Sequence, residues 1–444
     1  MEGLHMDKLI SWLEGSFAPK MNKVVENPWI LTIKNSVMQA LPLIFLGSIF
    51  SLLTIPENYL DWWPNFWTPY GWTFGIVSLI VAFLIPYNLL MHKGHKRAAI
   101  NGGIAGVILF LISLNPQFVA DEASMIESGK AAWVRISSIG GFGAGGMFLA
   151  IIAGLVAAAV LNKFADFSFF KPTSVIPDFV KDWFNSMLPI GLVTVLGWIL
   201  TDPKFLNLNL YQLVVAAFMP LQNVVNMPGG FILAMFLFCF LYSMGISTWV
   251  LTPVFTPVLL ANAAANTALA QAGEATAQNL ALFTDATIYS GYLWIGGIGC
   301  TLSLVLMMAF TAKSNQLKTL GRACLVPAIF NINEPCVFGV VAWNPIMMVP
   351  MWISGIVLPT LVYLFTKVIP LGAIPDMLFN MWYCPYPIAT MITCGTLGSL
   401  LLVLIIFAVS WIIWTPFFRT YDKQLADKEA KEAEEGDDDD DWSF

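Results

Sequence analysis

Blocks of about 20 apolar residues recur along this chain of 444 residues, and no other feature restricts its fold as much. A helix of that length crosses the hydrocarbon core of a bilayer and satisfies its own backbone hydrogen bonds there. Charged residues make up only 11% of the chain, against about 25% in soluble domains. The pattern predicts an all-α polytopic membrane protein with about ten transmembrane helices. The predicted spans are residues 30–54, 73–91, 98–115, 144–162, 187–200, 209–226, 229–250, 293–312, 346–366 and 392–415.

The positions of the basic residues predict how these helices are oriented. Lys93, Lys96 and Arg97 follow the second predicted span, and further Lys and Arg residues follow the fourth, eighth and tenth. Residues 205–312 contain neither Lys nor Arg. Because basic loops stay in the cytoplasm, both termini are expected on the cytoplasmic side. Apolar residues at helical spacing among charges in residues 5–26 predict an amphipathic helix on the membrane surface, within an interfacial segment 1–28.

Two apolar stretches contain too many helix-breaking residues to be simple spans. Residues 323–345 turn around Asn-Ile-Asn-Glu-Pro, and residues 370–391 contain four prolines. Both are predicted to be re-entrant hairpins, because irregular backbone at membrane depth survives only inside protein or along a wet cavity. The first hairpin carries Glu334, and a charged side chain at the bilayer centre costs at least about 2.5 kcal/mol. Glu334 is therefore the first candidate functional residue; the alternative is a structural acid paired with Arg322 or Lys318.

Polar and aromatic side chains near these two stretches form a candidate sugar-binding set. A sugar needs many hydrogen bonds for its hydroxyls and aromatic faces for its C–H surfaces. For any one tryptophan the alternative is a residue of the interfacial belt, and for Asn331 it is stabilisation of the turn. The candidates are Asn331, Asn333, Trp249, Trp382 and Asn380.

The run from Ile329 to Pro335, followed by Phe338 and Gly339, resembles the signature of a known family. It is similar to the membrane IIC component of the lactose/cellobiose/chitobiose branch of the bacterial phosphotransferase system. Residues 35–48, 172–189 and 242–246 are also similar to segments of that family. The resemblance covers the chain up to about residue 420.

The resemblance implies a specific fold and chemistry. It implies ten helices with two re-entrant hairpins, in a homodimer formed by the N-terminal half, residues 29–228. The C-terminal half, residues 229–419, would bind a disaccharide or β-glucoside in a bacterial cell membrane. Import would be coupled to phosphorylation of the sugar 6-hydroxyl by a phosphocysteine on a separate IIB protein, which a IIA protein supplies. Glu334 would orient the hydroxyl and act as its base, which makes the chain a component of a transport-coupled phosphotransferase.

This sequence departs from the family pattern at one position. Many relatives have a histidine where Ser247 stands, and neither Ser247 nor Thr248 offers a base near neutral pH. Both can still hydrogen-bond a sugar. His92 and His95 lie in the basic loop after the second span. They either belong to a solvent-exposed basic loop that only orients the chain in the membrane, which we call a topogenic cluster, or they contact the phosphoryl donor.

Other features exclude some functions and leave one alternative open. The six cysteines lack metal-ligand spacing, so neither a metal nor another cofactor is expected, and nothing indicates a nucleic-acid partner. Residues 260–289 are expected to form an outer loop with a short helix. Residues 420–444 hold eleven Asp and Glu against three Lys, which predicts an acidic disordered tail. The alternative function is a proton-coupled secondary sugar carrier in which Glu334 is protonated.

Overall fold

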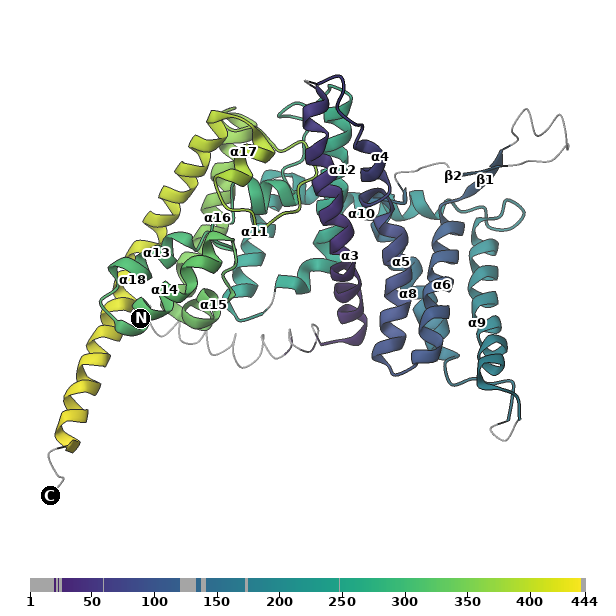
Figure 1. The fold of residues 1–444 in the computed structure, drawn as a ribbon, viewed down its shortest axis with the longest axis horizontal. Helices are drawn as coiled ribbons and strands as arrows, with labels where there is room; N and C mark the ends of the chain where they lie inside the picture. The colour runs from purple at the N-terminus through teal and green to yellow at the C-terminus, as the bar shows by residue number, and fades with distance from the viewer. Residues whose placement is uncertain are drawn as a thin grey trace. The chain divides into compact units, whose positions relative to one another are not determined.

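The computed structural model describes residues 20, 23, 26–58, 60–119, 133–136, 141–171, 175–246 and 248–440. Most of the predicted amphipathic segment 1–28 lies outside this set. The chain folds into two compact units, shown with their helices in Figure 1. The N-terminal unit contains Lys23–Gln222 and Thr252–Ala264, and the C-terminal unit contains Asn223–Leu251 and Ala265–Phe444. The predicted division at residue 228 lies close to the first of these boundaries, but residues 252–264 group with the N-terminal unit.

Eight helices within the described ranges are long and apolar enough to cross a membrane. The prediction of an all-α polytopic membrane protein is thereby confirmed. These helices are Pro28–Ser51, Trp67–His92, Lys96–Ser113, Ala144–Lys163, Val180–Thr201, Thr252–Gln271, Pro345–Val368 and Leu397–Glu432.

The N-terminal unit is built around helix α5, which contacts α3, α6 and α8. Gly106 on α6 lies so close to α5 that a Cβ there would be 2.2 Å from the carbonyl oxygen of Ala82. Such small residues allow membrane helices to approach closely. Its long helices are α3 (Pro28–Leu53), α5 (Val77–His92), α6 (Lys96–Ser113), α8 (Met147–Lys163), α9 (Asp178–Thr201) and α10 (Leu210–Asn226). Shorter elements are η2 (Ile55–Asn58), α4 (Trp67–Gly71), η3 (Phe74–Ile76), η5 (Ala144–Gly146) and an antiparallel pair of strands, β1 (Pro116–Val119) and β2 (Trp133–Ile136).

Two predictions about the middle of the chain need correction. Helices α10 and α11 (Pro228–Ser243) meet at a bend of 86° and pass as a membrane span only as a pair, although two separate spans were predicted. Helix α12 (Thr252–Gln271) is 20 residues long and a candidate span, so the short helix predicted within the loop 260–289 is longer and begins earlier than predicted. Its many alanines favour a helix, and the residues Asn262, Asn266 and Thr267, which suggested a loop, are buried on it.

The C-terminal unit combines long helices with irregular segments. The predicted span 293–312 is wrong in its first half, because helix α13 begins only at Leu302. Gly296 and Gly297 have φ angles of +79° and +100°, which an α-helix does not allow. The remaining elements are η6 (Thr248–Leu251), η7 (Ala286–Gly291), α13 (Leu302–Thr311), α14 (Asn315–Ile329), α15 (Glu334–Cys336), η8 (Val337–Val341), α16 (Pro345–Tyr363), η9 (Leu364–Val368), α17 (Ile388–Cys394) and α18 (Leu397–Asp440).

The C-terminal segment is helical where a disordered tail was predicted. Helix α18 is 44 residues long and continues from the last apolar span through Asp440. Ala, Glu and Lys in this segment favour a helix, and Lys428 pairs with Glu432 one turn along it at 3.5 Å. Asp422 and Glu429 also contact another part of the C-terminal unit, as described below. The disordered tail was predicted from the excess of Asp and Glu, without regard to the helix propensity of these residues.

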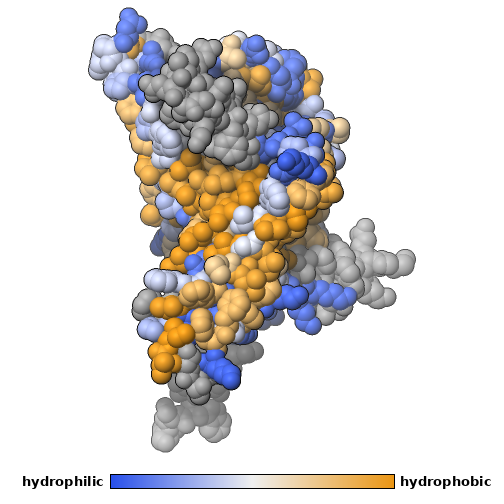
Figure 2. Space-filling model, turned by 90° about the vertical axis from the view of Figure 1, so that its right-hand side faces the viewer, coloured by the Kyte–Doolittle hydropathy of each residue, from blue (hydrophilic) through white to orange (hydrophobic). Residues whose placement is uncertain are grey.

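Apolar residues cover much of the outer surface of the helices. Figure 2 shows an apolar zone lying between hydrophilic groups at its two ends. Helix α9 is the least buried of the candidate spans. Exposed apolar area of this extent must be covered by lipid or by another protein surface. The large apolar side chains that α9 exposes are Trp183, Phe184, Met187, Leu192, Val195, Leu196, Trp198 and Ile199.

Candidate functional site

The Asn-Ile-Asn-Glu-Pro run forms a tight turn between α14 and α15. Asn331 occupies the left-handed region with φ of 60°, a conformation that asparagine tolerates better than most residues. Its amide nitrogen donates to the carbonyl oxygens of Trp382 and Cys384 at 2.8 and 3.0 Å. Its side-chain oxygen accepts from the backbone N–H of Gly296 at 3.0 Å. Asn331 therefore joins three segments that are far apart in the sequence.

Asn333 holds the other side of the turn. Its amide nitrogen donates to the carbonyl oxygen of Ile298 and to the hydroxyl of Thr301, both at 2.9 Å. A Cβ at Gly297 would lie 2.3 Å from the Asn333 side chain, so this glycine is required for the contact. Both asparagines were predicted to bind substrate; in this structure they bind other parts of the protein and stabilise the turn, the other role considered for Asn331. They fix the position of the next residue, Glu334.

Glu334 begins α15 with an exposed side chain. Within the described part of the chain neither Lys318 nor Arg322 forms an ion pair with it. The carboxylate thus stands exposed on a turn whose two asparagines are buried.

The end of α11 packs beside this hairpin. The ring of Tyr242 lies 5.7 Å from that of Phe338, and the backbone N–H of Trp343 donates to the carbonyl oxygen of Ser243 at 3.0 Å. Trp352 donates to the Ser243 hydroxyl at 2.8 Å. The segment that leads to the predicted sugar ligands is therefore anchored next to the Glu334 hairpin. Of those ligands, Thr248 is half-buried, while Ser247 and the Trp249 side chain lie outside the described residues.

The stretch around residues 380–386 lies against residues 285–296. Asn380, a predicted substrate ligand, donates to the carboxylate of Asp285 at 2.8 Å. Thr390 donates to the carbonyl oxygen of Gly291 at 2.8 Å, and Asn331 bridges Trp382 to Gly296. Asp285 was not among the predicted site residues. It is the only carboxylate between Glu274 and Glu334, and that isolation could have identified it.

Four buried polar atoms in these two segments have no hydrogen-bond partner among the described residues. They are the indole nitrogens of Trp294 and Trp382 and the hydroxyls of Ser290 and Tyr386. Leaving a buried donor unsatisfied costs about 1–3 kcal/mol, so such groups call for an explanation. A polar molecule bound between the segments would supply the missing partners.

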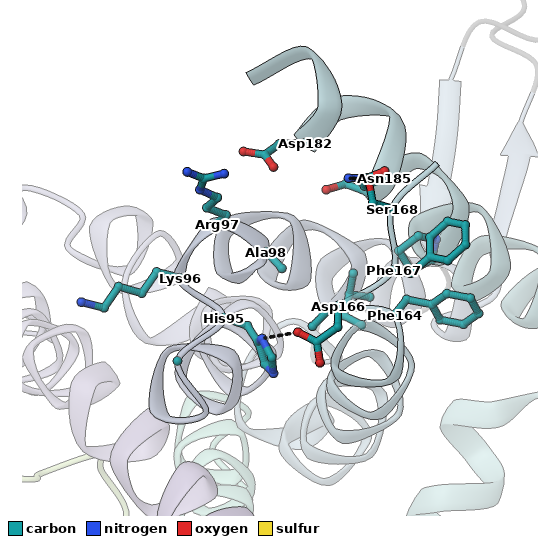
Figure 3. A pocket seen from close by; sticks show the side chains of 15 residues that line it. His95, Lys96, Arg97, Ala98, Phe164, Asp166, Phe167, Ser168, Asp182 and Asn185 are labelled. Atoms are coloured by element: carbon teal, nitrogen blue, oxygen red, sulfur yellow. Dashed lines mark hydrogen bonds and ion pairs between the residues drawn. The ribbon is translucent and has the colours of Figure 1, made fainter. Parts of the chain in front are cut away.

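A pocket in the N-terminal unit contains one of the two predicted donor-contact histidines. It has a volume of about 460 Å³ and is lined by residues 94–98 and by parts of α8, α9 and the segment between them (Figure 3). His95 is directed toward Asp166, with 3.8 Å between Nδ1 and the carboxylate. Lys96 and Arg97 also line it. His92 lies exposed at the end of α5.

A multi-pass helical fold whose irregular segments converge on an isolated carboxylate is the architecture of a membrane transporter. Residues 34–355 match the family model "Phosphotransferase system, EIIC". The chain belongs to this family, whose members work with IIA and IIB proteins and a sugar substrate.

Relatives support this membership over nearly the whole chain. The chain is 28% identical to the "PTS system cellobiose-specific EIIC component" of Geobacillus stearothermophilus over 447 residues, covering 96% of each. It is 27% identical to the "PTS system lactose-specific EIICB component" of Staphylococcus haemolyticus, covering 96% of this chain and 72% of that one. Its structure is similar to that of ChbC, the IIC component of an N,N'-diacetylchitobiose-specific phosphotransferase system. The TM-score is 0.79 at 27% identity, over 94% of this chain and 99% of ChbC.

Proposed function

We propose that this protein imports a β-linked disaccharide of the cellobiose or diacetylchitobiose type and that the sugar is phosphorylated as it enters. The donor is the phosphocysteine of a separate IIB protein. The observation that carries the proposal is the exposed carboxylate of Glu334 on a turn that Asn331 and Asn333 fasten to buried backbone. The names of the relatives support the substrate class.

The chemistry follows from the position of this carboxylate. The oxygen of the sugar 6-hydroxyl attacks phosphorus, a new O–P bond forms, and the S–P bond to the IIB cysteine breaks. The hydroxyl proton passes to Glu334, which holds and orients the hydroxyl beforehand. The leaving thiolate stays on IIB. Positioning accounts for most of the rate, because phosphoryl transfer requires the attacking and leaving atoms to be in line.

The sugar is proposed to lie between residues 290–294 and 382–386. The unpartnered nitrogens of Trp294 and Trp382 would donate to sugar oxygens, and the indole faces would contact its C–H surfaces. Asn380 and the Asp285 carboxylate add further polar groups close to this segment. Ser247, Thr248 and Trp249 remain predicted ligands from the end of α11, and Asn331 and Asn333 contribute chiefly by fixing the turn.

Replacing Trp382 by Phe tests the proposed sugar contact. We expect cellobiose to bind about tenfold more weakly, since the sugar oxygen that accepts from the indole nitrogen loses its donor in the complex. The melting temperature should hardly change, because the indole nitrogen has no protein partner among the described residues to lose. Isothermal titration and thermal unfolding of the purified protein measure both. Trp72→Phe, at a side chain 73% exposed in the N-terminal unit, is the control. Unchanged cellobiose binding would remove Trp382 from the site.

Reconstituted vesicles test the function as a whole. We expect vesicles containing this protein to accumulate sugar only when a phosphorylated IIB protein of a cellobiose system is enclosed in their lumen, at the cytoplasmic face of the protein, and only as sugar phosphate. Cellobiose, diacetylchitobiose and lactose should be compared. Uptake of free sugar driven by a proton gradient without IIB would overturn the proposal in favour of a secondary carrier.

The orientation of the chain is proposed from charge. In the N-terminal unit, the basic loop 93–97 and the end of α8 meet at one pocket, as loops on one side of a membrane should. In the C-terminal unit, the segment at Lys313 contacts α18 beyond its apolar part, at Asp422. We place these ends, and both termini, in the cytoplasm of the bacterial cell because basic loops stay there.

His92 and His95 are proposed as contacts for the IIB donor. We expect the His92→Ala/His95→Ala double variant to raise the KM for phospho-IIB about threefold to tenfold, because rim charges mainly affect association. Cellobiose binding should be unchanged. Lys204→Ala is the control, because Lys204 follows the fifth predicted span and therefore lies on the opposite side of the membrane in the proposed orientation. Steady-state sugar phosphorylation at varied phospho-IIB concentration gives the KM. An unchanged KM would mean that His92 and His95 do not contact IIB and belong only to the topogenic cluster.

Homodimer formation is proposed through the N-terminal half, residues 29–228. The extensive apolar exposure of α9 supports a protein or lipid partner there. Lipid is proposed to cover the remaining apolar surface of the spans.

A further inference from the structure

Two acidic side chains of α18 hold the N-terminal end of α14. Asp422, only 5% exposed, accepts hydrogen bonds from the backbone N–H groups of Lys313 and Ser314 at 2.9–3.0 Å. Glu429 accepts from the N–H groups of Asn315 and Gln316 at 2.8 and 3.0 Å. Four consecutive N–H groups are thus satisfied by carboxylates from another helix.

The contact also includes the capping residue of α14. The hydroxyl of Ser314 donates to Glu429 at 2.6 Å and accepts from the backbone N–H of Leu317 at 3.2 Å. Ser314 is fully buried. Hydrogen bonds to carboxylates are roughly twice as strong as neutral ones, and negative charge is favoured at a helix N-terminus. The Asp422–Glu429 clamp, as we name this set of contacts, therefore fixes where α14 begins.

Helix α14 connects this clamp to the Glu334 turn. At its middle, Gly321 packs so tightly on α13 that a Cβ would lie 2.5 Å from the backbone nitrogen of Ala309. At its far end, the next residues are the turn that Asn331 fastens to Gly296 and Trp382. The helix is thus held at its start, its middle and its end. Because Gly321 fixes the middle of α14, a movement at the start of the helix would also displace its other end, which leads to Glu334.

We propose that Asp422 and Glu429 are positioning residues for phosphoryl transfer, because they hold α14 and thereby the Glu334 turn at its opposite end. The inference rests on the proposed function, in which Glu334 receives the proton of the sugar hydroxyl. A displacement of about 1 Å at a reacting group can lower a rate about a hundredfold, so a clamp far from the chemistry can affect it. The segment that carries the clamp was predicted to be a disordered tail.

Glu429→Gln is the main test. An amide keeps one acceptor oxygen but loses the charge and the second acceptor, so exchange of the 313–317 amides should rise about tenfold. We expect kcat for sugar phosphorylation to fall about tenfold while KM for cellobiose changes less than twofold. Hydrogen exchange by mass spectrometry on the full protein in nanodiscs, and steady-state kinetics with phospho-IIB, provide the two measurements.

Matched variants distinguish positioning from general loss of structure. Glu432→Gln removes a carboxylate of the same helix that pairs only with the exposed Lys428 among the described residues, and it should behave as wild type. Asp422→Asn should act as Glu429→Gln does, with a larger effect. Faster amide exchange with unchanged kcat would overturn the positioning role, and so would equal losses of kcat and cellobiose binding. A wild-type protein that makes no sugar phosphate would overturn the proposed function instead, while the exchange data would still establish or reject the clamp.

Discussion

Glu334→Gln is expected to lower sugar phosphorylation about a thousandfold and to leave cellobiose binding largely intact. A general base contributes typically about 10²–10⁴-fold to a rate, and an amide cannot accept the proton of the 6-hydroxyl. The side chain is exposed and makes no ion pair with the described residues, so the replacement should cost little stability. The assay is formation of sugar phosphate from phospho-IIB with the variant in vesicles.

Two further variants make this result specific. Glu334→Asp keeps the carboxylate on a shorter side chain and should retain partial activity. Glu274→Gln changes an exposed carboxylate outside the site and should be as active as wild type. Full activity of Glu334→Gln would remove Glu334 from the mechanism.

Asn331→Leu is expected to lower the free energy of unfolding by about 3–5 kcal/mol and to abolish transport. The variant loses three hydrogen bonds and leaves the N–H of Gly296 and the carbonyls of Trp382 and Cys384 without their partner. Leucine is also strained at a φ of 60°. Thermal unfolding in detergent should show a clearly lower melting temperature, and vesicle uptake should be lost.

Controls separate the backbone strain from the lost hydrogen bonds. Asn331→Gly removes the bonds without strain and should lie between Asn331→Leu and wild type. Asn207 also has a positive φ, of 49°, with an exposed side chain, so Asn207→Leu reports strain alone. Wild-type stability in Asn331→Leu would show that the three bonds are not what holds the turn.

Local sequence features predicted most of the fold. Spans such as 98–115 and 346–366 correspond to α6 and α16 because apolar length and helix formation are properties of a continuous segment. The prediction at 293–312 was wrong in its first half, where glycines break a segment whose hydropathy alone suits a span. The helix at 252–271 was overlooked because its polar residues are satisfied by partners that hydropathy does not reveal, as when Asn266 bonds to Pro375 at 3.0 Å.

The candidate site was only partly predictable for a related reason. Glu334 could be identified because a carboxylate in an apolar stretch costs free energy whatever the rest of the fold is. Asp285 could have been identified in the same way. By contrast, the roles of Asn331 and Asn333 depend on residues 32 or more positions away, and nothing local distinguishes an amide that binds sugar from one that binds backbone.

Apolar length, helix breakers and the cost of a charge act locally, so the amino-acid order was enough to place this chain in a membrane and Glu334 in a turn. The folded structure was needed to show that two asparagines fasten this turn to residues 296–301 and 382–384, and that Asp422 and Glu429 hold the helix leading to it. Hydrogen bonds between distant segments depend on where the folded chain places them. For that reason residues 422–429, which composition assigns to a solvated tail, have a defined place beside α14.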